Sequence, residues 1–193
     1  MSALPHSWIS PEEYLRIERA AEFKSEYFDG EMYAMSGGTL AHSRIPQYLT
    51  IALDAQITAR GCHSCNSDMR VGITTRGPFV YPDLTIACGE PHLADDQNDV
   101  LLNPTVVFEV LSKSSEVYDR GQKFAQYRRI SSLREYVLVS QHEPRIEVFS
   151  RDEDGKWSIT EAAGLDSVFS LPSLKAEITL AAVYRNISLT PTQ

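Results

Sequence analysis

The sequence predicts an α/β or α+β fold built on one mixed β-sheet flanked by helices. A helical pattern and a hairpin come first, a long amphipathic segment follows, and short apolar runs then surround one more helical pattern. Segments of helical and strand periodicity in this order are typical of a sheet covered by helices. At 193 residues the chain is long enough to bury a core. We therefore expect a single domain over residues 1–193, with its core over about 10–185.

The N-terminal segment predicts a helix followed by a hairpin. Ser10 is suited to the N-cap and Pro11 to the first helical position, and two glutamates follow. In SEYFDGEMYAM, two short strand patterns flank an Asp29-Gly30 pair, which is typical of a tight hairpin turn.

The long amphipathic segment predicts a helix over residues 40–61. Pro46 is tolerated if it lies in the first turn, where its missing N–H costs nothing, and Gly61 ends the helix. Strands are then expected in HSCNS, MRVGIT, DLTIAC, PTVVFEVLS, REYVLVS, RIEVFSR and KWSITEA, with a polar loop over 89–99 and a DEDG turn. SEVYDRGQKFAQYRRI is expected to be helical, and the tail to form a short strand or turn and a short helix.

Composition limits the cellular environment and the binding partners that we expect for this protein. The formal net charge of −8 counts against a protein that coats nucleic acid through a general positive field. No apolar run approaches the roughly 20 residues of a membrane span, and the first residues lack the pattern of a signal peptide. Three cysteines are too few for a disulfide framework, so we expect a cytoplasmic protein with reduced thiols. Cys62 and Cys65 have the spacing of a zinc site, but four clear ligands are lacking.

Two acids in apolar runs mark the candidate site. Asp83 lies in YPDLTIAC and Glu109 in PTVVFEVLS, and acids are rarely buried without a partner. Two carboxylates near a lysine suit a divalent metal phosphodiesterase, since Mg²⁺ prefers oxygen ligands. An acid, any residue and a lysine would be the usual order, but Leu111 occupies the lysine position. Lys123, on the following helix, is the expected replacement, and Lys113 is the alternative.

The segments YFDGEMYAMSG, YPDLTIACG, NPTVVFEVLSKSSEVYDRGQKFAQY and SLREYVLV resemble the Uma-type putative endonuclease family, a branch of the PD-(D/E)XK nuclease superfamily. The resemblance covers roughly residues 10–185 and implies a restriction-endonuclease-like fold. It implies Mg²⁺ or Mn²⁺ bound by Asp83 and Glu109, a catalytic Lys123, and Glu31 as a further acid of the site. Lys113 stands where the family commonly has proline. The implied substrate is nucleic acid, and DNA is the expected kind.

Other residues are weaker candidates. His42, near the start of the long helix, would line the site or cap the helix. Tyr127 follows Asp119 and Lys123 at i, i+4 spacing, so it shares their helix face. Arg120 and Arg128, with Arg129 beside them, are candidates for phosphate contact, although such arginines are more often surface charges.

The sequence leaves two alternative functions open, and we also expect one oligomeric state. The same fold and site would serve a catalytically silent module that binds DNA or a partner. A glycosidase that uses Asp83 and Glu109 as acid and base is the other enzymatic alternative. A homodimer is expected because two-fold dimers are the commonest oligomers and the C-terminal strands would offer an edge for pairing.

Overall fold

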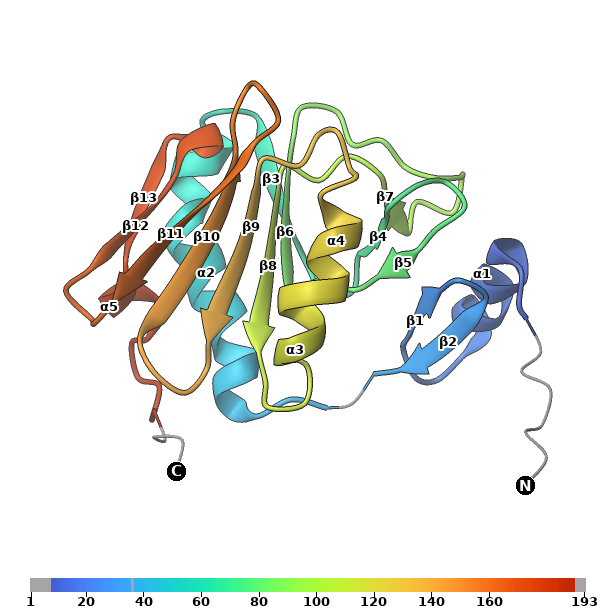
Figure 1. The fold of residues 1–193 in the computed structure, drawn as a ribbon, viewed down its shortest axis with the longest axis horizontal. Coiled ribbons are helices and arrows are strands. Elements are labelled where there is room, and N and C mark those ends of the chain that lie inside the picture. The colour runs from blue at the N-terminus through green and yellow to red at the C-terminus, as the bar shows by residue number, and fades with distance from the viewer. Residues whose placement is uncertain (1–7, 36, 190–193) are drawn as a thin grey trace.

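The computed structural model describes residues 8–35 and 37–189 (Figure 1). A six-stranded mixed sheet in the order β11-β10-β9-β8-β6-β3 forms its centre. Strand β8 pairs parallel to β9, and all other neighbours in this sheet are antiparallel. The strands are β3 (Cys62–Asn66), β6 (Leu84–Cys88), β8 (Val106–Leu111), β9 (Glu135–Ser140), β10 (Arg145–Arg151) and β11 (Trp157–Ala163). The predicted fold class, a mixed sheet flanked by helices, is confirmed.

Helices cover both faces of this sheet (Figure 1). Helix α2 (Leu40–Thr58) packs on one face, where its apolar residues join those of the strands in the largest hydrophobic cluster. The other face carries α3 (Glu116–Tyr118), the π-helix η1 (Asp119–Lys123) and α4 (Phe124–Tyr127). In β8, Phe108 packs in the cluster with α2, and Val107 packs in the cluster with α4. Because side chains alternate along a strand, Glu109 points to the same face as Val107.

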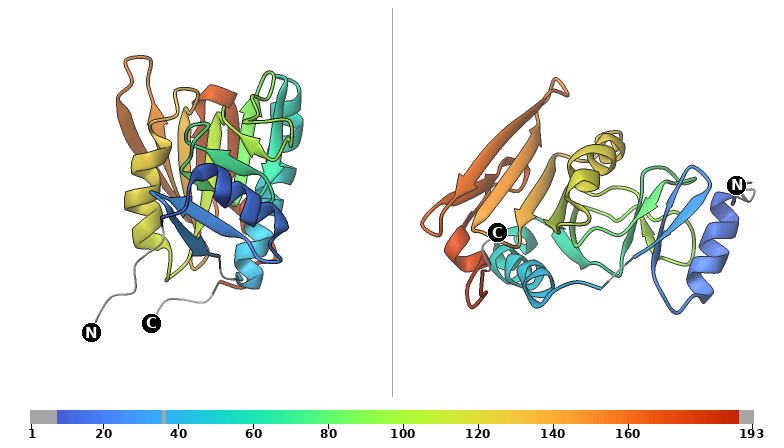
Figure 2. Two further views of the ribbon diagram at one scale, coloured as in Figure 1. Left: turned by 90° about the vertical axis from the view of Figure 1, so that its right-hand side faces the viewer. Right: turned by 60° about the horizontal axis from the view of Figure 1, so that its bottom comes forward.

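The hairpin does not belong to the central sheet, so the expectation of a single sheet was wrong. A five-stranded sheet has the order β2-β1-β5-β4-β7, and helix α1 (Pro11–Ala20) lies beside it (Figure 2). Its strands are β1 (Ser25–Phe28), β2 (Glu31–Ala34), β4 (Arg70–Gly72), β5 (Phe79–Val80) and β7 (Val100–Leu101). Two of them have only two residues, too few to produce a periodic pattern, yet they complete this sheet.

The tail forms a small third sheet. Strands β12 (Val168–Leu171) and β13 (Ala176–Thr179) flank the 3₁₀ helix η2 (Pro172–Leu174), and α5 (Leu180–Val183) follows. Apolar residues of this segment, including Phe169 and Leu180, join the same hydrophobic cluster as helix α2. The tail therefore completes the core on the α2 side.

The local signals near the N-terminus are confirmed with one exception. Ser10 caps α1 by accepting a hydrogen bond from the Glu13 N–H, and Asp29 and Gly30 both have positive φ in the hairpin turn. Helix α2 begins at Leu40, however, so Pro46 lies in its second turn and not its first. The helix tolerates this proline because its apolar face is buried against the sheet. Tertiary packing of this kind supplies most of the stability of a helix.

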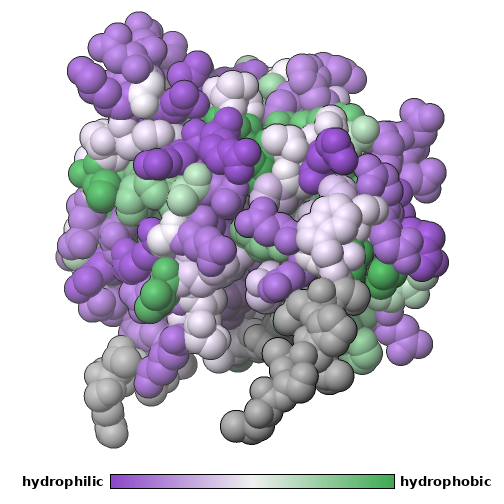
Figure 3. Space-filling model, turned by 45° about the vertical axis from the view of Figure 1, so that its right-hand side comes forward, coloured by the Kyte–Doolittle hydropathy of each residue, from purple (hydrophilic) through white to green (hydrophobic). Residues whose placement is uncertain are grey.

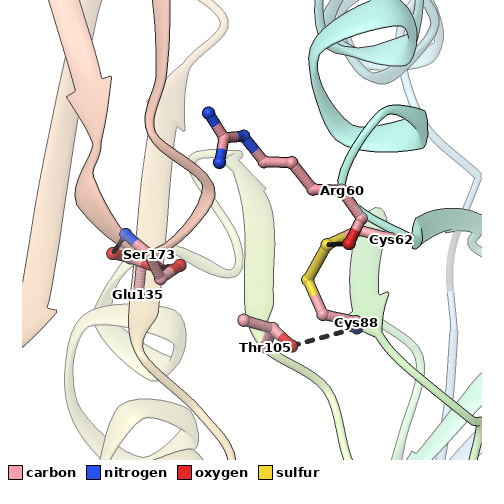
Figure 4. Close-up of a disulfide and its surroundings, with 6 residues drawn as sticks. All are labelled: Arg60, Cys62, Cys88, Thr105, Glu135 and Ser173. Carbon is pink, nitrogen blue, oxygen red and sulfur yellow. Dashed lines mark hydrogen bonds between the residues drawn. A yellow bond between two sulfur atoms is a disulfide. The ribbon is translucent and has the colours of Figure 1, made fainter.

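A disulfide joins Cys62 to Cys88, so the expectation of reduced thiols was wrong for this pair (Figure 4). The two cysteines are direct partners in the antiparallel pairing of β3 with β6. The number of cysteines cannot reveal this bond, because it depends on the register between two strands. The two cysteines themselves are 26 residues apart in the chain. Cys65 remains a free thiol, so the Cys62–Cys65 spacing does not present two thiolates to zinc.

The described helices include none that is both long and apolar enough to cross a membrane. The face drawn in Figure 3 is mainly hydrophilic, and its hydrophobic groups form small, separate patches. The expected cytoplasmic location stays a prediction, as does the single domain, whose ends at 1–7 and 190–193 lie outside the described residues.

Glu135 gives a pH-dependent test of this fold away from the candidate site. Its side chain is buried and accepts hydrogen bonds from the N–H and hydroxyl of Ser173, yet burial raises its pKa above the ordinary 4.5. A raised folded-state pKa means that stability from this group is lost as the pH rises from the ordinary value through the folded-state value. We expect Glu135→Gln to raise the Tm at about pH 8 and to lose that advantage near pH 4.

Thermal melts across this pH range measure the effect. Glu153→Gln, in the exposed turn between β10 and β11, is the matched control and should leave the Tm unchanged. A Glu135→Gln protein that is less stable than wild type at about pH 8 contradicts the assignment.

Candidate active site

Asp83 and Glu109 lie opposite each other on neighbouring strands. In the antiparallel pairing of β6 with β8, Leu84 is the partner of Phe108, so Asp83, one residue before β6, falls opposite Glu109. Directly opposed residues in such a pair point to the same face of a sheet. The Val110 N–H donates to Asp83 Oδ2 at 2.7 Å, which fixes one carboxylate oxygen. The register therefore places the two carboxylates on adjacent strands and on one face of the sheet.

Lys123 joins the same site from the π-helix η1. Its Nζ lies 3.0 Å from Glu109 Oε1, 3.0 Å from Glu26 Oε1 and 3.7 Å from Asp119 Oδ1. The side chain of Lys123 is only 8% exposed, so these contacts are made largely away from solvent. The structure thus brings the expected helix lysine to Glu109. Lys113 is exposed in the turn that follows β8 and does not line the cleft described below.

Glu26 is the acid that the sequence interpretation missed. It lies on β1, is 6% exposed, and accepts a hydrogen bond from the Tyr81 N–H at 3.1 Å. Glu31, which was expected to join the site, begins β2 and accepts a hydrogen bond from the Tyr33 hydroxyl at 2.6 Å. The sequence signal for Glu26 is weaker than that for Glu109, because only Tyr27 and Phe28 of the strand segment SEYF are apolar.

A second buried acid holds the segments that carry Glu26 and Asp83. Glu18, on α1, accepts hydrogen bonds from the Ser25 N–H at 3.0 Å and from the Tyr81 hydroxyl at 2.9 Å. Ser25 directly precedes Glu26, and Tyr81 lies two residues before Asp83. Helix α1 therefore holds the segments next to both acids, one through a backbone N–H and the other through a tyrosine hydroxyl.

The remaining candidates take different places. The Tyr127 hydroxyl donates to Glu109 Oε1 at 3.0 Å from a fully buried position. His42, in the first turn of α2, places Nε2 3.6 Å from Asp83 Oδ2. Arg120 is engaged by Glu147 and Glu116 in ion pairs. The other two candidates for phosphate contact, Arg128 and Arg129, are exposed.

The site contains more acid than base, and burial and charge together shift the pKa values of Asp83, Glu109 and Lys123. Burial raises the pKa of Glu109 well above its ordinary value, although the charge of Lys123 opposes this shift. Burial also raises the pKa of Asp83, against the influence of His42. For Lys123, burial alone would lower the pKa, but Glu109, Glu26 and Asp119 together raise it well above the ordinary value. Lys123 is therefore a persistent cation, and the surplus of carboxylate favours binding a further proton or cation.

A cleft of about 600 Å³ opens onto these groups. Its walls come from the β1–β2 hairpin, the start of α2, the end of β8 and the α3–η1 helix. Glu26, Asp83, Glu109 and Lys123 line it, as does His42. Tyr127 does not line the cleft, so it acts on Glu109 from behind.

The donor set fits a Mg²⁺ or Mn²⁺ ion that keeps part of its water. Within residues 8–35 and 37–189, no three His, Cys, Asp or Glu side chains are grouped so as to bind one metal ion. Asp83 and Glu109 nevertheless offer two carboxylates on one face, and Mg²⁺ usually takes one or two carboxylates together with waters and phosphate oxygens. The residues therefore suit a hydrated ion and not an all-protein cage.

Comparison with known proteins places the chain in a family. A family model described as "Uma2: Putative restriction endonuclease" matches residues 11–183. The chain belongs to the Uma2 family. Two relatives of uncharacterized function come from Synechocystis: slr1290 is 34% identical over 95% of both chains, and sll1609 is 33% identical over 86% of this chain and 94% of its own.

A solved structure shares the fold of this Uma2 chain. It is described as a "putative nuclease belonging to DUF820" from Anabaena variabilis. It superposes with a TM-score of 0.73 at 15% identity, covering 91% of this chain and 97% of the other. The likeness at this identity establishes the fold, in agreement with the restriction-endonuclease-like architecture that the resemblance implied.

Tyr127 offers a test of how Glu109 is held. We expect Tyr127→Phe to destabilise the protein by about 1–2 kcal/mol, because a buried carboxyl group loses a hydrogen-bond donor. Chemical denaturation measures the free energy of unfolding. Tyr184→Phe is the matched control, since its buried hydroxyl donates to the Ser140 and Arg145 carbonyls from the α2 side of the sheet, the face opposite Glu109. A Tyr127→Phe protein as stable as wild type would show that this hydroxyl does not help to hold Glu109.

Proposed function

We propose that this Uma2 protein is a Mg²⁺- or Mn²⁺-dependent endonuclease that hydrolyses phosphodiester bonds, with DNA as its substrate. The observation that carries the proposal is the placement of Asp83 opposite Glu109, with Lys123 Nζ 3.0 Å from Glu109. The family description and the fold of the Anabaena protein point the same way.

The proposed reaction is hydrolysis. A water oxygen bonds to phosphorus, one P–O ester bond breaks, and the leaving oxygen ends with a proton from water. A bound divalent ion would supply Lewis acidity at the phosphate and lower the pKa of its water. Asp83 and Glu109 would hold that ion. Lys123, kept protonated by its acidic neighbours, would offset the charge that develops on the phosphate and would not act as the base.

Two rivals are distinguished by specific observations. A silent module of the same fold would bind its partner without cleaving DNA in any metal. A glycosidase needs two carboxyl groups that flank a sugar, but Glu109 is only 3% exposed and faces Lys123. The buried ammonium between the acids favours phosphate chemistry over sugar chemistry.

Nicking of supercoiled plasmid DNA tests the proposal. The assay is run in Mg²⁺, in Mn²⁺ and in EDTA, with a parallel RNA substrate. We expect nicked and linear plasmid in either metal and none in EDTA. Intact plasmid under every condition, from protein whose melting curve shows a folded state, supports the silent module instead. Cleavage of RNA without cleavage of DNA would identify RNA as the substrate.

We also propose a homodimer that forms through the free edge of the central sheet. Of the three C-terminal strands, β9 and β10 are internal and β11 is the edge, where Ile159 is 61% exposed. Light scattering is expected to give twice the mass of one chain, and Ile159→Lys to shift the protein to a monomer because charge blocks edge pairing. A monomer mass for the wild type at all concentrations contradicts this assembly.

A further inference from the structure

One wall of the cleft is aromatic. In the β1–β2 hairpin, Tyr33 is the direct partner of Glu26, so its ring lies on the same face as that acid. Phe28 contacts Tyr33 edge to face, with ring centroids 6.2 Å apart, and contacts Tyr118 in the same manner at 5.6 Å. Phe28 is buried, but Tyr33 is 50% exposed. The row therefore runs from the acids outward and ends in an accessible ring.

The cleft offers little positive charge to a phosphate backbone. Of the described residues that line it, Lys123 alone is a lysine or arginine, against the acids Glu26, Asp83, Glu109 and Asp119. Lys123 is engaged by three of these acids. The neighbouring Arg120 is engaged by glutamates outside the cleft. Proteins that hold duplex DNA rely on many lysine and arginine contacts to phosphates, and this cleft lacks them.

The cleft also has an uncharged polar wall, and its volume is small. Ser112, Ser114, Ser115 and Gln122 line the wall formed by the turn after β8 and the following helix. Hydroxyl and amide groups can donate to phosphate oxygens or to the edges of bases. A volume of about 600 Å³ is in the range of sites that enclose one small ligand, and a duplex is far wider.

From these observations we propose that the cleft binds an unpaired strand of DNA, with one base stacked on Tyr33 and the adjoining phosphate held by the divalent ion that Asp83 and Glu109 would bind. Stacking on an aromatic ring needs no cation and tolerates any base, because every base has a π-face. The part of this inference that concerns cleavage rests on the proposed function, whereas the stacking contact does not. Single-stranded DNA, or a single-stranded region within a duplex, is thus the expected substrate class.

Binding of labelled oligonucleotides tests the inference without requiring cleavage. Fluorescence anisotropy in Ca²⁺ compares a mixed-sequence single strand with the same strand in a duplex, and a gel checks that both stay intact. The single strand is expected to bind more tightly. Tyr33→Leu should weaken single-strand binding about tenfold, within the effect reported for removal of one stacking side chain, and leave duplex binding unchanged.

Two further variants test whether the effect comes from the aromatic ring of Tyr33. Tyr33→Phe keeps the aromatic face but loses the hydroxyl that donates to Glu31, and it should bind the single strand as wild type does. Phe23→Leu removes an aromatic side chain that is 80% exposed outside the cleft, and it should also have no effect. An adenine analogue such as 2-aminopurine in the strand should be quenched by wild type and much less by Tyr33→Leu.

The outcomes separate this inference from the proposed function. Equal or tighter duplex binding, or a Tyr33→Leu variant that binds single strands normally, overturns the inference. Plasmid nicking together with either result leaves the endonuclease proposal standing. Single-strand binding that depends on Tyr33, without cleavage of any DNA in Mg²⁺ or Mn²⁺, overturns the endonuclease proposal and leaves the stacking site in place.

Discussion

Lys123→Met is expected to abolish DNA cleavage and to destabilise the metal-free protein by about 3–5 kcal/mol, the usual cost of removing one partner of a buried ion pair. Lys123 Nζ contacts Glu26, Glu109 and Asp119, and these buried acids would lose their shared cation. Their mutual repulsion then acts in a poorly solvated site. Methionine fills much of the space of the lysine stem, so the loss reflects charge more than packing.

Chemical denaturation and plasmid nicking measure the two effects. Lys113→Met is the matched control, because that lysine is exposed and does not line the cleft, and it should change neither stability nor activity. A divalent ion should raise the Tm of Lys123→Met more than that of wild type, since a cation would relieve the same repulsion. If Lys113→Met abolishes cleavage and Lys123→Met does not, the lysine of the turn is catalytic and the assignment is reversed.

Asp83→Asn and Glu109→Gln are each expected to lower metal-dependent cleavage at least about 100-fold, because loss of even an outer partner of a metal site costs about 10–100-fold. Each change removes an anionic oxygen from the proposed ligand pair. Asparagine at position 83 can still accept the hydrogen bond from the Val110 N–H, so the local backbone should hold. The pKa of Asp83 is raised by burial, which means that its charge costs stability at neutral pH.

The metal-free Asp83→Asn protein should therefore melt at a higher temperature than wild type at neutral pH. The gain should vanish as the pH falls below the ordinary Asp pKa of about 4, where the wild-type carboxyl group is neutral in both states. Melting curves with EDTA and with Mn²⁺ measure this, and the metal should stabilise wild type more than the variant. Asp83→Asn with wild-type nicking activity would instead favour the silent module.

Features that depend on near neighbours in the chain could be predicted from sequence alone. The capped start of α1 at Ser10 and the Asp29-Gly30 turn follow from local backbone preferences, and the structure has both. The i, i+4 spacing of Asp119 and Lys123 put them on one helix face before any fold was known, and they meet in the site. The acids in apolar strands likewise stood out without a structure.

Features that depend on the pairing of distant segments appear only in the folded protein. The register of β6 against β8 places Asp83 opposite Glu109, and the register of β3 against β6 joins Cys62 to Cys88. Strand register is set by contacts between segments, so a periodic pattern within one segment does not contain it. Glu26 reaches Lys123 for the same reason: the hairpin and the π-helix are far apart in sequence and meet only when both pack beside the central sheet.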